Sequence, residues 1–165
     1  MRFPNEKIKT PLELAEIVRA RQAEGKTVVH CHGVFDFVHL GHANYFEQAK
    51  RLGDIVYVGV IADRFVRKGP GRPHFQEHER LAWVASLESV DYVVLNEEEG
   101  PWSLIRTARP NIFVKDEADR KKLDDPSSKL HDDIRCIEDV GGRFVFIPVE
   151  VNVHSTDIFR RLGLE

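Results

Sequence analysis

Short apolar runs rich in β-branched residues alternate with stretches of helical spacing, and this alternation constrains the fold most. The runs are TVVHC (27–31), DIVYVGVIA (54–62), DYVVLN (91–96), NIFVK (111–115) and RFVFIPV (143–149). Helical spacing covers residues 11–24, 42–53, 75–89, 102–109, 128–140 and 155–162. This order predicts a three-layer α/β fold, with a five-stranded parallel sheet and helices on both faces. Ligands of such sheets bind beyond the carboxyl ends of the strands.

The length of 165 residues suits one domain. We expect an N-terminal helical extension over residues 1–26, followed by the main domain over residues 27–165. Thr10, Pro11 and Glu13 form a helix-start pattern with a capping box, and Gly25 ends that helix. The polar segment 115–133 is expected to be a mobile loop.

Composition favours a cytoplasmic protein without nucleic-acid or membrane partners. The net charge of −3 gives no basic field, and no apolar run approaches the roughly 20 residues that span a bilayer. The first residues lack the order typical of a signal peptide, in which a charged region is followed by an apolar region and small residues. Two cysteines, Cys31 and Cys136, form no disulfide framework.

The segment VVHCHGVFDFVHLGH, residues 28–42, is predicted to run from a strand through a turn into a helix. Gly33 gives the turn its backbone freedom, and Gly41 permits close approach just before the helix. His39 and His42 are three residues apart, so both imidazoles can reach one spot at the positive end of the helix. The pattern indicates a donor cluster for phosphate oxygens.

Two other interpretations of this segment stay open. A zinc site would need three or four ligands, and the sequence contains no second Cys or His cluster at metal spacing. The two histidines could also be purely structural. His30, Cys31 and His32 are interpreted as strand packing.

The turn resembles the H-x-G-H signature of the nucleotidyltransferase α/β superfamily, in the form G-x-F-D-x-x-H-x-G-H. That form occurs in glycerol-3-phosphate cytidylyltransferases and in adenylyltransferases that make nucleotide-heptoses. The resemblance implies a Rossmann-like fold and catalytic roles for His39 and His42. It also implies nucleotide binding by the turn and helix start, that is by Gly33, Val34, Phe35, Asp36 and Gly41.

A basic loop, KGPGRP (68–73), follows the second predicted strand. Its composition fits either a solvated loop or a flexible arm over phosphates. With Glu79-Arg80 and ASLESVDYVV, it resembles a segment of heptose-phosphate adenylyltransferases, which implies that Lys68 and Arg80 contact the triphosphate. Asp63 and Arg72 are candidate contacts to the acceptor.

Two later segments match the same families less closely. VNVHSTDIFRRLG (151–163) resembles the I-S-S-T-x-I-R signature, which implies that Ser155 and Thr156 reach nucleotide phosphates, although Arg160 is offset by one position. Lys115 and Asp116 are candidate nucleotide contacts, because the families place Gly-Asp or Gly-Gly-Asp after this strand, where this chain has Lys115-Asp116-Glu117. The missing glycine implies an altered base pocket, and the choice between ATP and CTP stays open.

The resemblance implies an enzyme that transfers a nucleoside monophosphate, AMP from ATP, to a sugar phosphate such as heptose 1-phosphate. Mg²⁺ would accompany the nucleoside triphosphate, pyrophosphate would leave, and the enzyme would be a homodimer. One alternative is a cytidylyltransferase that uses CTP and glycerol 3-phosphate or another polyol phosphate. An alternative of another class is a regulatory module that binds nucleotide without turnover.

Overall fold

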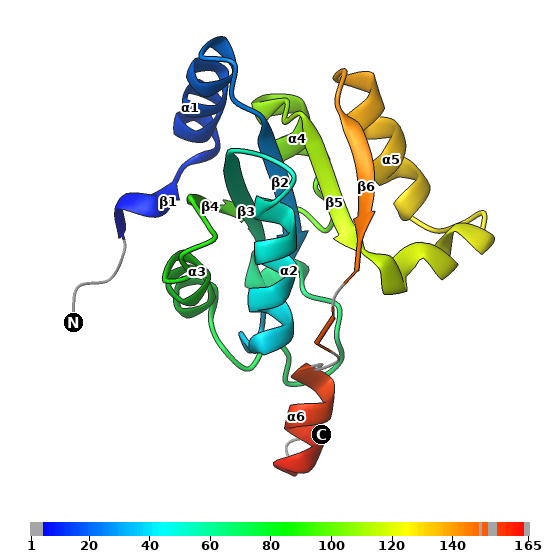
Figure 1. Cartoon of the computed structure of the whole chain (residues 1–165). Coiled ribbons are helices and arrows are strands. Elements are labelled where there is room, and N and C mark those ends of the chain that lie inside the picture. The colour runs from blue at the N-terminus through cyan, green and yellow to red at the C-terminus, as the bar shows by residue number, and fades with distance from the viewer. Residues whose placement is uncertain (1–4, 149, 152–154, 164–165) are drawn as a thin grey trace.

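A single parallel sheet of six strands organises the chain (Figure 1). The computed structural model describes residues 5–148, 150–151 and 155–163. The strand order is β1-β4-β3-β2-β5-β6, and every neighbouring pair is parallel. The strands are β1 (Ile8–Lys9), β2 (Val28–Gly33), β3 (Ile55–Ile61), β4 (Tyr92–Asn96), β5 (Ile112–Asp116) and β6 (Arg143–Ile147). The predicted α/β fold is confirmed, with one strand more than expected.

Helices cover both faces of this sheet, as predicted. They are α1 (Pro11–Ala23), α2 (Leu40–Lys50), α3 (Glu77–Ala85), α4 (Trp102–Ala108), α5 (Leu130–Asp139) and α6 (Ser155–Arg161). Apolar side chains of α2 and α3 form one core with the sheet, whereas α1, α4 and α5 pack on the other face. Helix α6 lies beyond the carboxyl ends of the strands (Figure 1).

The sixth strand comes from the N-terminal segment. Ile8 and Lys9 pair with Val93 and Val94 of β4 and form one edge of the sheet. Two residues are too few to show an alternating pattern, so no apolar pattern predicts this strand. Helix α1 follows with the predicted capping box between Thr10 and Glu13. The sheet therefore continues across the domain boundary predicted at residue 26.

The segment expected to be a loop contains eight residues of 3₁₀-helix, η3 (Glu117–Asp124). Asp116 begins this helix, because its carboxylate accepts a hydrogen bond from the backbone N–H of Ala118. Ion pairs join residues three apart along η3, one of them Lys122 to Asp119 at 2.6 Å. Side chains at that spacing eclipse one another in a 3₁₀-helix, so the charge pattern suits this conformation. The prediction of a loop was wrong for these residues.

Two histidines of β2 belong to the core, as the sequence predicted. His30 is fully buried and stacks on Tyr57 with the ring centroids 4.4 Å apart. Burial lowers the pKa of His30 well below its ordinary value, and the nearby Lys115 ammonium lowers it further. Burial lowers the pKa of His32 in the same way. Both imidazoles are therefore neutral in the folded chain near neutral pH.

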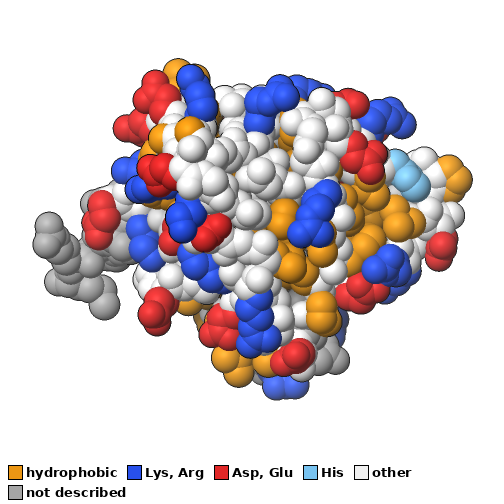
Figure 2. Space-filling model, turned by 45° about the horizontal axis from the view of Figure 1, so that its top comes forward, with side chains coloured by type: hydrophobic (Ala, Val, Ile, Leu, Met, Phe, Trp, Pro, Cys, Tyr) orange, Lys and Arg blue, Asp and Glu red, His pale blue; other side chains and the backbone are white. Residues whose placement is uncertain are grey.

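The surface mixes charges of both signs. On the face in Figure 2, Lys and Arg side chains lie among Asp and Glu side chains. Among the described residues, no helix combines the length and the apolar character needed to cross a bilayer.

The buried His30 predicts a specific pH dependence of stability. Below about pH 6.5 the unfolded chain binds a proton that the folded chain excludes, so the free energy of unfolding falls by up to about 1.4 kcal/mol per pH unit for each such histidine. Between about pH 7 and about pH 5, the free energy of unfolding measured with urea should fall by about 2 kcal/mol less in His30→Phe than in the wild type. Equal losses in both proteins would contradict this account.

Candidate functional site

The turn after β2 has a conformation that most side chains avoid. Phe35 has a φ of +52°, in the left-handed region, where a bulky residue is uncommon. Its ring lies over Gly33, and a Cβ atom at Gly33 would come within 3.0 Å of it. The same ring packs against Phe46 and meets His42 edge-on, with centroids 5.2 and 5.3 Å apart. Phe35 thus joins the turn to the first helical residues behind it.

The two histidines of the signature lie together at the start of α2. Their imidazole rings are stacked, with centroids 3.8 Å apart. His39 is the N-cap residue, but its side chain does not cap the helix, and Gly41 is buried between the two histidines. The positive end of an 11-residue helix and two imidazoles therefore face the same place. The sequence predicted that the two rings lie together at the helix start, and this arrangement suits a phosphate group.

Both carboxylate oxygens of Asp36 accept hydrogen bonds from groups of the protein. It accepts a hydrogen bond of 2.6 Å from Arg72 Nε. Its other carboxylate oxygen accepts the backbone N–H groups of His74 and Phe75, at 2.8 and 3.1 Å. Both side chains of the Arg72–Asp36 pair are almost fully buried. Asp36 therefore fixes the basic loop against the histidine turn.

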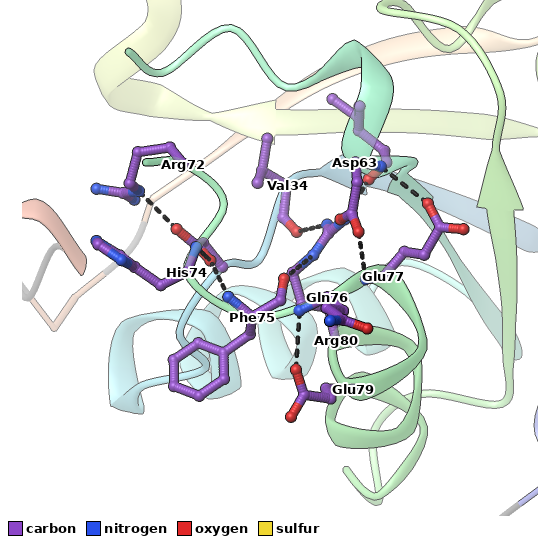
Figure 3. A network of polar contacts seen from close by, with 11 residues as sticks. Val34, Asp63, Arg72, His74, Phe75, Gln76, Glu77, Glu79 and Arg80 are labelled. Carbon is purple, nitrogen blue, oxygen red and sulfur yellow. Dashed lines mark hydrogen bonds and ion pairs between the residues drawn. The ribbon is translucent and has the colours of Figure 1, made fainter. Parts of the chain in front are cut away.

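Arg80 of α3 occupies the centre of a polar network (Figure 3). Its side chain is fully buried. The guanidinium donates hydrogen bonds to four oxygen atoms, which belong to the backbone carbonyls of Val34, Ile61 and Phe75 and to the Asp63 carboxylate. It thereby joins the histidine turn, the end of β3 and the end of the basic loop. These contacts favour a positioning role for Arg80 over the direct phosphate contact expected from the sequence.

Asp63, expected at the acceptor, lies in the same network (Figure 3). One carboxylate oxygen accepts from Arg80 at 2.7 Å, and the other accepts from the backbone N–H of Glu77 at 3.2 Å. The Glu77 carboxylate in turn accepts from the backbone N–H of Asp63 at 2.9 Å. Asp63 therefore joins the end of β3 to the start of α3, and about a third of its side chain (36%) stays exposed.

The remaining candidate residues belong to the basic loop and to the C-terminal segment, around the carboxyl edge of the sheet. Lys68 is exposed on the loop after β3. Phe159 of α6 is buried against the loop, with its ring centroid 4.6 Å from the Arg72 guanidinium carbon and 4.2 Å from the His74 ring. Ser155 and Thr156 begin α6, but their side chains lie outside the described part of the chain.

Lys115 and Asp116 end β5 and make different contacts. Lys115 Nζ lies 3.6 Å from the Asp133 carboxylate of α5, so this side chain points to the face opposite α2. Asp116 caps η3. The helix η3 thus begins directly after β5, and the sheet separates the side chain of Lys115 from the helix that bears the histidine pair.

Sequence analysis missed the partners that position these groups. The pairs Asp36–Arg72 and Arg80–Asp63 join residues far apart in the chain, and no local spacing predicts them. Glu77 and Phe159 were not selected because each carries no chemistry typical of nucleotide transfer. One available signal was Asp36 itself, a charged residue inside an otherwise apolar turn.

The network predicts that removing Arg80 destabilises the fold. Arg80→Ala would leave three buried carbonyls without their donor, and we expect it to lower the free energy of unfolding by about 3–5 kcal/mol. Arg64→Ala, which removes an exposed ion pair with Glu97, should cost less than about 1 kcal/mol. Urea unfolding measures both. An Arg80→Ala protein of wild-type stability with weakened nucleotide binding would show instead that Arg80 acts on the ligand.

Several known proteins are similar to this chain in sequence. Residues 30–161 match the model of the family described as cytidylyltransferase-like. The chain is 37% identical over 158 residues to the bifunctional protein HldE of Syntrophotalea carbinolica, covering 94% of this chain and 31% of that protein. It is 38% identical over 163 residues to the HldE protein of Trichlorobacter lovleyi, covering 98% of this chain and 32% of that protein. The chain thus spans about a third of these relatives.

A solved structure supports the same relationship. It is the lipopolysaccharide core biosynthesis protein of Thermoplasma volcanium GSS1, with a TM-score of 0.61 and 27% sequence identity. The match covers 78% of this chain and all of that one. The family match includes the histidine turn, the basic loop and all of α6. The chain belongs to the cytidylyltransferase-like family.

Proposed function

We propose that this chain is a nucleotidyltransferase that transfers AMP from ATP to a sugar phosphate, with heptose 1-phosphate as the acceptor. The stacked His39 and His42 imidazoles at the start of α2 carry this proposal. Family membership supports the reaction class. The segments resembling heptose-phosphate adenylyltransferases, and the similarity to HldE proteins, support the acceptor.

In the proposed reaction an oxygen of the acceptor phosphate attacks the α-phosphorus of the nucleotide. The new P–O bond forms as the bond from the α-phosphorus to the bridging oxygen breaks, and pyrophosphate leaves in line. Such a reaction needs positioning and charge stabilisation more than covalent help. His39 and His42 would donate hydrogen bonds to the α-phosphate and bridging oxygens, and the positive end of α2 would stabilise the growing charge.

The other residues would support the nucleotide from the edges of the site. The backbone of Gly33–Phe35 and of Gly41 would cradle the phosphates, with Asp36 holding the turn. Lys68 would neutralise the pyrophosphate from the basic loop. Ser155 and Thr156 would complete the phosphate contacts from the start of α6.

Mg²⁺ would accompany the nucleotide, bound mainly by phosphate oxygens and water. Among the described residues, no three His, Cys, Asp or Glu side chains converge as metal ligands, so the protein would add few ligands of its own. A homodimer and a cytoplasmic location are part of the same proposal.

Substitution of the histidine pair tests the proposal. We expect His39→Ala and His42→Ala each to lower kcat/KM for pyrophosphate release by at least about 100-fold, because each removes a donor to the charged transition state. Circular dichroism and the urea midpoint should stay near wild type. His78→Ala, on the exposed side of α3, is the matched control and should keep its activity.

A substrate panel separates the alternatives. ATP and CTP are each offered with heptose 1-phosphate and with glycerol 3-phosphate. Turnover with CTP and glycerol 3-phosphate would indicate the cytidylyltransferase. Nucleotide binding in calorimetry without pyrophosphate release from any pair would indicate the regulatory module. Near-normal turnover in both histidine variants would remove the basis of the mechanism.

A further inference from the structure

One aromatic side chain docks α6 onto the rest of the site. Helix α6 lies beyond the carboxyl ends of the strands, apart from the helices that cover the two faces of the sheet (Figure 1). Among the described side chains of α6, those of residues 158–161, Phe159 is the one that is buried, with an exposed fraction of 2%. Burial of a phenylalanine ring removes a large apolar surface from water. This ring is therefore the apolar anchor of the described part of α6.

The Phe159 ring lies between the histidine turn and the end of the basic loop. It meets Phe37 of the turn edge-on, with the ring centroids 5.8 Å apart. On the other side, its centroid lies 4.2 Å from the His74 ring and 4.6 Å from the guanidinium carbon of Arg72. The side chains of Arg72 and His74 extend to the side of the polar network opposite Asp63 (Figure 3). The helix, the turn and the loop therefore meet at one ring.

Phe159 also covers a buried ion pair. Arg72 Nε donates to the Asp36 carboxylate at 2.6 Å, and the two side chains are 4% and 0% exposed. A guanidinium over an aromatic face is attracted by the ring, and the attraction is stronger where water is excluded. The attraction between the two charges weakens where water enters, because the local dielectric constant rises. Loss of the ring would therefore weaken the connection between the basic loop and the histidine turn.

We propose that Phe159 is a positioning residue that joins α6 to the basic loop, so that the two segments close over the nucleotide as one unit. In the proposed function, Lys68 of the loop neutralises the pyrophosphate, and Ser155 and Thr156 of α6 contact the phosphates. The inference rests on the proposed function for this assignment, whereas the docking rests on the contacts of the ring. A nucleotide held by one segment would stabilise the other, because the shared contact couples their positions.

Tryptic cleavage of the free protein tests the docking without any turnover. Lys68 is exposed on the loop, and cleavage after it follows the fraction of molecules in which the loop opens. We expect Phe159→Ala to speed this cleavage at least about fivefold, and Phe159→Leu, which keeps an apolar side chain, to speed it less than about twofold. Leu162→Ala is the matched control, because Leu162 directly follows the same helix and is 63% exposed. It should leave the rate unchanged.

Cleavage after Lys121, an exposed residue of η3, serves as the internal reference. A change confined to Lys68 would show that the ring acts on the basic loop. Equal acceleration at both lysines would overturn the proposal, because the ring would then act on global stability alone. An unchanged rate after Lys68 in Phe159→Ala would overturn it as well.

A double-mutant cycle in the intact enzyme tests the coupling. We expect Lys68→Ala to raise KM for ATP at least about tenfold alone but less than about threefold in the Phe159→Ala background, because the loop is then no longer held near the phosphates. KM for heptose 1-phosphate should change less than about twofold in Phe159→Ala. Additive effects of the two substitutions would contradict the coupling. Lack of turnover with heptose 1-phosphate would refute the proposed function, whereas the cleavage rates would still decide whether Phe159 docks α6 on the loop.

Discussion

The buried guanidinium of Arg80 is the interaction on which the candidate site depends. It donates hydrogen bonds to the backbone carbonyls of Val34 in the histidine turn, of Ile61 at the end of β3 and of Phe75 just before α3. Asp36 makes the complementary connection, because it accepts two backbone N–H groups and the Arg72 side chain. A cation and an anion inside the protein thus satisfy loop groups that water would otherwise satisfy. The histidine pair has a fixed place because this network fixes the turn before it.

At the carboxyl edge of the sheet, the two faces differ in the side chains that they present. On the face of α2 and α3, the charged side chains of Asp36, Arg72 and Arg80 make contacts within the protein, and the two imidazoles lie at the start of α2. On the face of α4 and α5, three lysines and three acidic residues line a hollow at the same edge, and Trp102 interacts with Asp133 in its wall. The sheet separates the two environments, because Cys31 of β2 belongs to the core under α2 and α3 whereas the next residue, His32, lines the hollow.

The sequence predicted most of the architecture, because long apolar runs and helix spacing are local signals. All five predicted strands and all six predicted helices are present in the described chain. β1 was missed because two residues form no pattern, and η3 was missed because its charges are as typical of a solvated loop. The histidine pair was predicted from spacing alone. The contacts of Arg80, Asp63 and Arg72 were not predicted, since their partners are distant in sequence. An arginine in a motif does not reveal whether its side chain contacts a ligand or a backbone carbonyl.

A structure with a non-hydrolysable ATP analogue and Mg²⁺ tests the central claim most directly. The account predicts the α-phosphate within hydrogen-bonding distance of both the His39 and His42 imidazoles, with Arg80 still bound to its backbone carbonyls. A nucleotide whose phosphates lie beside Trp102 and Asp133, or away from the start of α2, would contradict it.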